Sequence, residues 1–125
     1  MLETAIACLA LNVYHEARGE PVEGQYAVAL VTINRARKNP QNVCREVYRH
    51  KQFSWTLTPG LKVTDWKAYK RSVAVAKRAW ALKDFTAGAD HFHTTDVSPP
   101  WASNLEYAGQ WGNHYFYRSH KVATQ

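Results

Sequence analysis

The sequence predicts an α+β fold, mainly helical, with a small antiparallel sheet near the C-terminus. Apolar residues recur at steps of three and four through much of residues 2–82, as they do on the buried face of a helix. The last third instead carries short runs dense in aromatic residues, bounded by glycine and proline, which is typical of strands. Because 125 residues suit one domain, we expect residues 1–125 to form a single domain.

Two helices are predicted before residue 40. Residues 2–18 form the first, and Gly19 ends it, because glycine readily adopts the backbone conformation that follows a helix. Pro21 opens the second helix from its first position, where a missing N–H costs nothing. The dipeptide Asn39-Pro40 ends that helix, after a last turn that carries Arg35, Arg37 and Lys38.

Two more helices follow, separated by a loop over residues 50–61. The first is short, over residues 43–49, and the second runs to about Leu82 after a cap at Thr64 or Asp65. The apolar seam predicted to bury the long helix is Trp66, Tyr69, Val73, Ala76 and Trp80. Its other faces carry the basic residues Lys67, Lys70, Arg71, Lys77, Arg78 and Lys83.

Two strands are predicted at the end of the chain, over residues 90–95 and 114–119. Pro99-Pro100 prevents regular structure just after the first strand, and residues 101–112 are expected to form a loop. Most of the aromatic residues that alternate along these strands should be buried: Phe92, Tyr115 and Tyr117.

Charge and composition restrict the classes of partner. The chain has 16 basic and 10 acidic residues, for a net charge of +6, and 16 aromatic residues. A basic, aromatic-rich domain suits an anionic or polymeric partner, such as nucleic acid, a membrane surface or a cell-wall glycan. No stretch approaches the roughly 18 apolar residues that span a bilayer. Cys8 and Cys44 can form at most one bridge, and we expect two buried thiols instead.

Glu16 is the leading candidate for acid–base chemistry. It lies in the last turn of a mostly apolar helix, next to a break in the chain. Burial there and the negative end of the helix dipole both disfavour the carboxylate, which keeps a proton available near neutral pH. The alternative is a salt bridge to Arg18. Glu20 and Glu23 fit a cap and a first-turn position of the next helix.

Histidines and loop tryptophans are the other candidates. His91 and His93 share one face of a strand, and His114 can reach them from the neighbouring strand, which would make a zinc site. The helical metal motif HExxH is absent. Trp55 and Trp101 lie in irregular segments, where an aromatic ring can stack on a sugar or cover the core.

Eight segments, in order along nearly the whole chain, also match a known pattern: NVYHEARGEP at 12–21, GQYAVA at 24–29, INR at 33–35, VC at 43–44, QFSW at 52–55, GADHFH at 88–93, PWA at 100–102 and GNHYFY at 112–117. Together they resemble the SleB/CwlJ-type cell-wall hydrolases, which are spore cortex-lytic enzymes and their bacterial and phage relatives. The resemblance implies a compact lysozyme-like or lytic-transglycosylase-like fold acting on peptidoglycan. It also implies that Glu16 is catalytic.

The resemblance further implies a set of substrate-binding residues: Gln52, Phe53, Ser54, Trp55, His93 and Trp101. We expect no metal and no cofactor. The expected partner is peptidoglycan glycan strands, not nucleic acid, and we expect a monomer without stable membrane insertion. We expect action at the bacterial cell wall. Because no signal peptide is recognisable, we expect either a phage endolysin or a domain of a larger secreted protein.

The implied reaction is cleavage of the bond between N-acetylmuramic acid and N-acetylglucosamine, with Glu16 as the acid. A lytic transglycosylase then closes an anhydro ring and needs no second carboxylate, whereas a hydrolytic lysozyme does. The candidates for that second group are Asp90, Asp96 and Glu106. Two other classes stay open: a zinc amidase or peptidase using His91, His93 and His114, and a non-enzymatic binder of nucleic acid or cell wall.

Overall fold

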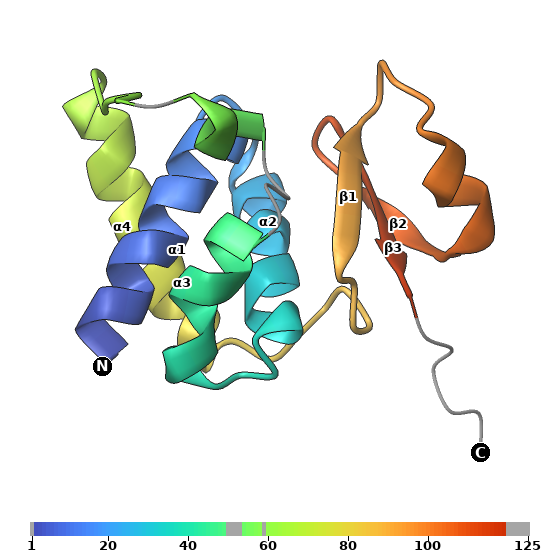
Figure 1. Ribbon diagram of the computed structural model, residues 1–125, viewed down its shortest axis with the longest axis horizontal. Coiled ribbons are helices and arrows are strands. Elements are labelled where there is room, and N and C mark those ends of the chain that lie inside the picture. The colour runs from blue at the N-terminus through green and yellow to red at the C-terminus, as the bar shows by residue number, and fades with distance from the viewer. Residues whose placement is uncertain (1, 50–53, 59, 120–125) are drawn as a thin grey trace.

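Helices gather on one side of the molecule and a small sheet lies on the other (Figure 1). The computed structural model describes residues 2–49, 54–58 and 60–119. The helices of the described chain are α1 (Leu2–Ala17), α2 (Val22–Arg35), α3 (Pro40–Tyr48), α4 (Trp66–Ala81) and the short 3-10 helices η2 (Ser54–Leu57) and η3 (Pro100–Asn104). The strands are β1 (His91–Thr94), β2 (Glu106–Trp111) and β3 (His114–Arg118). The α+β prediction is therefore confirmed.

Helix α1 lies at the centre of the helical layer and packs against α2, α3 and α4. Leu9, Ala10 and Val13 are fully buried on it, as the predicted spacing requires. Helix α2 is buried along most of its length. None of the helices in the described chain is long and apolar enough to cross a membrane.

The junction between α2 and α3 differs from the prediction. Helix α2 ends at Arg35, because Arg37 and Lys38 adopt left-handed φ angles of 54° and 57° that no helix continues. Asn39 then caps α3, with its side chain accepting a hydrogen bond from the Gln41 amide, and Pro40 is the first helical residue. The pair Asn39-Pro40 therefore starts α3 and does not end α2.

Helix α4 begins where expected but buries a different face. Asp65 caps it by accepting a hydrogen bond from the Ala68 amide. The prediction that Trp66 is buried was wrong, because this first helical residue is 63% exposed. Trp80 does pack against the core as predicted. The fully buried positions carry small residues that allow close approach to α1 and α2: Ala68, Ser72, Val75, Ala76 and Ala79.

The sheet has the strand order β1-β3-β2 and is antiparallel throughout. The prediction of a loop over residues 101–112 was wrong, because η3 and β2 occupy most of this range. A bulge between Tyr107 and Gly109 interrupts the alternation that would have marked β2. The signal that could have found this strand is Gly112-Asn113, a two-residue hairpin loop between two aromatic runs.

The two faces of the sheet have different environments. Phe116 and its cross-strand partner Phe92 lie on the face that packs on the helical core. Tyr115 and Tyr117 pair with His93 and His91 on the opposite face and are only partly buried. The prediction that both tyrosines are buried was therefore wrong. Side chains alternate along β3, so Tyr115 and Tyr117 lie on the other face of the sheet from Phe116.

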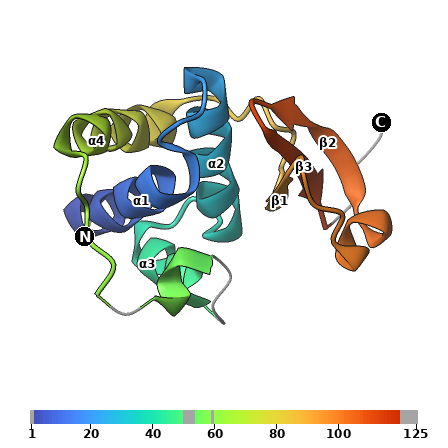
Figure 2. The ribbon, with the colours of Figure 1, turned by 90° about the horizontal axis from the view of Figure 1, so that it is seen from above.

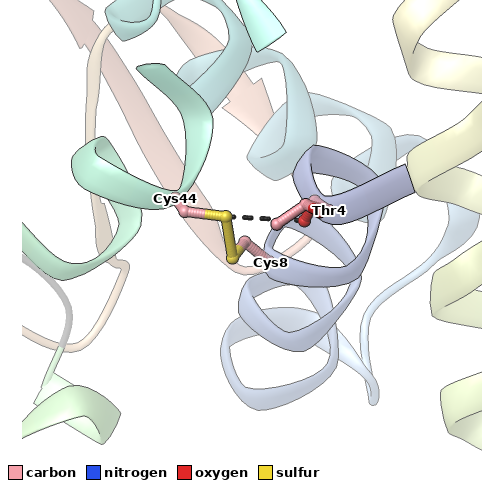
Figure 3. Close-up of a disulfide and its surroundings, with 3 residues drawn as sticks. All are labelled: Thr4, Cys8 and Cys44. Atoms are coloured by element: carbon pink, nitrogen blue, oxygen red, sulfur yellow. Dashed lines mark hydrogen bonds between the residues drawn. A yellow bond between two sulfur atoms is a disulfide. The ribbon is translucent and has the colours of Figure 1, made fainter. Parts of the chain in front are cut away.

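A disulfide joins α1 to α3, so the prediction of two free thiols was wrong. Cys8 and Cys44 are bridged across a sequence separation of 36 residues, with their Cα atoms 5.3 Å apart (Figure 3). The Cys44 sulfur also lies 3.4 Å from the Thr4 carbonyl oxygen. Sequence spacing alone could not predict the pairing, because it depends on how α3 packs on α1.

We predict that replacing both cysteines by alanine lowers the free energy of unfolding by about 4 kcal/mol, because the cross-link restricts the unfolded chain. Urea denaturation of the oxidised parent and of the Cys8→Ala/Cys44→Ala variant measures this difference. Equal midpoints would show that the bridge does not stabilise the fold.

Candidate active site

Glu16 lies one residue before the end of α1 in a partly buried position. Burial raises the pKa of its carboxyl from the ordinary 4.5 to about 7. Within the described residues, no hydrogen bond or ion pair engages this carboxyl. Glu16 is therefore a desolvated acid that keeps its proton to a higher pH than an ordinary carboxyl.

The salt bridge considered for Glu16 does not form, because Arg18 is directed elsewhere. The Arg18 guanidinium lies 4.6 Å from the centre of the Tyr14 ring and donates a hydrogen bond to the Tyr14 carbonyl oxygen. The hydroxyl of the buried Tyr14 accepts hydrogen bonds from the backbone N–H groups of Thr64 and Asp65, at 3.2 and 3.0 Å. The last turns of α1 thus hold the start of α4 in place.

Trp55 is fixed on α1 one turn before Glu16. Its indole N–H donates to the Asn12 side-chain oxygen at 2.8 Å, and the buried Asn12 donates to the Thr32 hydroxyl at 3.3 Å. The Trp55 ring also stacks on His15, with ring centroids 4.5 Å apart. The structure therefore brings Trp55 and Glu16 to the same end of α1. The sequence did not indicate that Asn12 and His15 would be the residues that hold this ring.

The other candidates in the same loop are less completely described. Gln52 and Phe53 lie outside the described residues. Ser54 begins η2, but its side chain also lies outside the described part of the chain.

A second group of candidates lies on the outer face of the sheet. His93 stacks on Tyr117 with ring centroids 5.3 Å apart, and the His93 Nε2 atom lies 2.9 Å from the Tyr117 hydroxyl. The His93 Nδ1–H donates to the Thr94 carbonyl oxygen at 2.7 Å, which fixes the ring orientation. Trp101, from η3, approaches both rings edge-on at 5.6 Å. Sequence reasoning paired His93 with Trp101 but missed Tyr117.

The proposed three-histidine zinc site is not formed. His91 and His93 lie on the outer face of the sheet, whereas His114 lies on the face that packs on the helices, against Phe92 and Phe116. Burial lowers the pKa of His114, which favours the neutral ring. Among the described residues, no group of three histidine, cysteine or acidic side chains could hold a metal ion.

Glu20 does not cap α2. Instead, hydrogen bonds to its carboxylate tie the segment between α1 and α2 to the β2–β3 turn. Its carboxylate accepts hydrogen bonds from the backbone N–H of Asn113 at 2.6 Å and from the Asn113 side chain at 3.4 Å. A Cβ atom at Gly112 would overlap the Glu20 Oε1 atom, so this close approach requires glycine. Helix α2 has no side-chain cap, and Glu23 is exposed in its first turn as predicted.

The end of α2 forms a second tie to the sheet. Asn34 donates hydrogen bonds to the Asp84 carboxylate at 3.1 Å and to the Ala89 carbonyl oxygen at 2.9 Å. The Arg35 Nε–H donates to the Asp90 carbonyl oxygen at 2.6 Å, immediately before β1. The two ties thus fix the sheet to the helical layer at the β2–β3 turn and at the start of β1.

The three candidates for a second carboxylate all have partners. Asp96 accepts from the Thr94 hydroxyl at 2.5 Å, and Glu106 forms an ion pair with Arg118 at 2.5 Å. Burial opposes ionisation of Asp90, but hydrogen bonds from His91 and Ser119 outweigh it and hold the pKa of that carboxyl below its ordinary value.

Comparison with known proteins identifies the family. A model described as Cell Wall Hydrolase matches residues 19–117. The chain belongs to this family. The match begins three residues after Glu16, so the evidence for Glu16 comes from its own environment. The matched range includes nearly all of the sheet and the residues Glu20, Asn34 and Arg35 that bind it to the helices.

Individual relatives extend the comparison to nearly the whole chain. Spore cortex-lytic enzymes of Bacillus subtilis and Halalkalibacterium halodurans are each 30% identical over 89% of this chain, which spans about a third of their length (36% and 34%). The catalytic domain of the germination-specific lytic transglycosylase SleB from Bacillus anthracis is 25% identical, with a TM-score of 0.78 over 94% of this chain and 97% of that one. The catalytic domain of the Bacillus cereus SleB protein shares the fold, with a TM-score of 0.73 over 93% of this chain and 91% of that one, at 24% identity.

We predict that Glu16→Gln stabilises the fold in a pH-dependent way. Below pH 4.5 Glu16 is protonated in both states; between 4.5 and about 7 the unfolded chain loses its proton first, so the parent loses stability as pH rises. The variant should therefore gain up to roughly 3 kcal/mol over the parent at pH 8 and much less at pH 4.5. Urea denaturation at both pH values measures the gain, and a gain independent of pH would contradict the raised pKa.

Proposed function

We propose that the chain is a peptidoglycan glycosidase that cleaves the glycan backbone between N-acetylmuramic acid and N-acetylglucosamine, as a lytic transglycosylase. The observation that carries this proposal is the buried Glu16 carboxyl, whose pKa is raised to about 7 and which has no partner among the described residues. A glycosidase needs an acid of this kind, because a glycosidic oxygen leaves readily only when it is protonated. The similarity to a protein titled as a lytic transglycosylase supports the reaction type.

Glu16 acts in two steps. It first donates its proton to the oxygen that links the two sugars, and the bond breaks through an oxocarbenium-like state at C1 of the muramic residue. The C6 hydroxyl of the same residue then attacks C1, and the Glu16 carboxylate accepts the hydroxyl proton. The products are a 1,6-anhydro end and a free GlcNAc end, no water is consumed, and the protonated enzyme is regenerated. A pKa near 7 suits both roles, because neither protonation state is strongly disfavoured at neutral pH.

The surroundings of the other carboxylates support a mechanism with one acid. Asp90, Asp96 and Glu106 are each engaged by hydrogen bonds or an ion pair, as described above, and the pKa of Asp90 is held below its ordinary value. A general base or nucleophile would have to leave these partners first. Transglycosylation requires no such group and is therefore the reaction that the described residues support best.

The two aromatic groups offer surfaces for sugar rings. Trp55 lies beside the turn that carries Glu16, and Trp101 packs with His93 and Tyr117 on the outer face of the sheet. Both tryptophans are partly exposed, so one ring face or edge remains accessible to the C–H groups of a sugar. We propose that they contact different parts of the glycan strand. Disulfides persist outside the reducing cytoplasm, and the cell wall also lies outside it. The disulfide therefore supports action at the wall.

The test is the activity of Glu16→Gln on purified peptidoglycan. Removing the acid while keeping the shape of the side chain should lower turnover by at least about a hundredfold, because no other described group can replace the proton donor. Turbidity of a peptidoglycan suspension measures the rate, and circular dichroism verifies the fold. Mass spectrometry of the parent's fragments should show muramic ends that are one water lighter than hydrolysed ends.

Glu23→Gln is the matched control, because Glu23 is exposed in the first turn of α2 and should leave activity unchanged. Full lytic activity in Glu16→Gln would refute the assignment of the acid. Fragments with ordinary reducing ends would refute transglycosylation and point to hydrolysis.

A further inference from the structure

Helix α4 lies on the side of the helical layer away from the sheet (Figures 1 and 2) and carries a row of exposed basic residues. Its buried face, made of small residues, packs on α1 and α2. The opposite face is exposed and carries all of the basic residues of this helix: Lys67, Lys70, Arg71, Lys77 and Arg78. These side chains account for much of the excess positive charge of the chain.

The arrangement of these five charges is narrow and uncompensated. At 100° per residue and 1.5 Å of rise, they fall within an arc of about 120° and along roughly 16 Å of the helix. Helix α4 contains no acidic residue, and within the described chain none of the five forms an ion pair. Neighbours such as Lys67 and Arg71 repel each other at i and i+4, which costs helix stability. A face that served only for solubility would be better stabilised by charges of both signs.

Trp66 adds an apolar surface at the edge of this basic face. It is 63% exposed and lies one turn before Lys70, and its ring contacts Tyr69 edge-on. An exposed indole beside several cations suits a ligand that alternates negative groups with carbon-rich units. Lysine and arginine, in turn, bind phosphate oxygens through charge-assisted hydrogen bonds.

We propose that this face of α4 is a second binding surface, separate from the catalytic site, for a phosphodiester polymer of the cell wall. The choice of a wall polymer over other polyanions rests on the proposed function, which places the chain on peptidoglycan. Binding through α4 would concentrate the enzyme on its insoluble substrate, because a tethered catalytic site meets the glycan at high effective concentration. The position of α4, across the helical layer from the sheet, leaves His93 and Trp101 free for the glycan (Figure 2).

The experiment measures binding in a Glu16→Gln background, so that the wall is not digested. The α4 variant is Lys70→Gln/Arg71→Gln/Arg78→Gln. The probes are cell-wall sacculi that retain their phosphodiester polymers and the same sacculi stripped with hydrofluoric acid. We expect the α4 variant to bind intact sacculi at least about tenfold more weakly than its parent, because each lost cation removes attraction to the polyanion. Removal of the phosphodiester polymers should weaken binding of the parent to sacculi and leave binding of the α4 variant unchanged.

The matched control is Arg37→Gln/Lys38→Gln/Arg45→Gln, which removes two arginines and one lysine from exposed positions outside α4. It should weaken binding by less than about threefold, since net charge alone acts through screened long-range attraction. Equal losses in both triple variants, or undiminished binding of the parent to stripped sacculi, would overturn the proposal. The proposal would also be overturned if the α4 variant lost binding to DNA or to phosphatidylglycerol vesicles but not to sacculi. The α4 surface would then bind another polyanion.

Cleavage of short soluble glycan fragments separates this proposal from the proposed function. With Glu16 intact, the α4 triple variant should cleave soluble fragments at the parental rate. A reduced rate would place α4 in catalysis and contradict a separate binding surface. If the parent itself cleaves no glycan, the proposed function fails, while the sacculus-binding comparison remains a valid test of the α4 surface.

Discussion

The burial of the last two turns of α1 is the constraint on which the rest of the structure depends. In these turns the polar groups of Asn12 and Tyr14 are buried, and each is satisfied by a group far away in the sequence. Those bonds position Trp55 and the start of α4. Glu16 lies in the same turns and is desolvated without receiving a partner among the described residues. The stability gained by packing α1 therefore offsets the cost of keeping one acid in an unfavourable environment.

The sheet is placed relative to this helix by two short ties. Glu20, four residues after Glu16, bonds the β2–β3 turn, and Asn34 and Arg35 bond the segment that leads into β1. All three residues lie within the stretch that the family model matches, and their hydrogen bonds position the sheet. The outer face of the sheet, with His93 and Trp101, is thereby fixed to the helical layer that carries the acid.

Sequence periodicity predicted the helices well, because each buries one face against a common core. It failed where an outcome depended on tertiary contacts. The bulge at Gly109 hid β2, and the bridge between Cys8 and Cys44 depends on the packing of α3 on α1. Trp66 was assigned to the core because its spacing fitted the seam, although the helix had only just begun there. Glu16 was found because its burial and its position at a helix end are both local properties, whereas the partners of His93 required the strand register.

The proposed function requires the Glu16 carboxyl to hold its proton up to neutral pH in the folded chain. The most direct measurement is a titration of the Glu16 side-chain carboxyl by 13C NMR, with Glu16→Gln to assign the signal. We expect a midpoint near 7, well above the ordinary value of 4.5. A midpoint near 4.5 would contradict it, because Glu16 would then be an ordinary surface carboxylate at neutral pH.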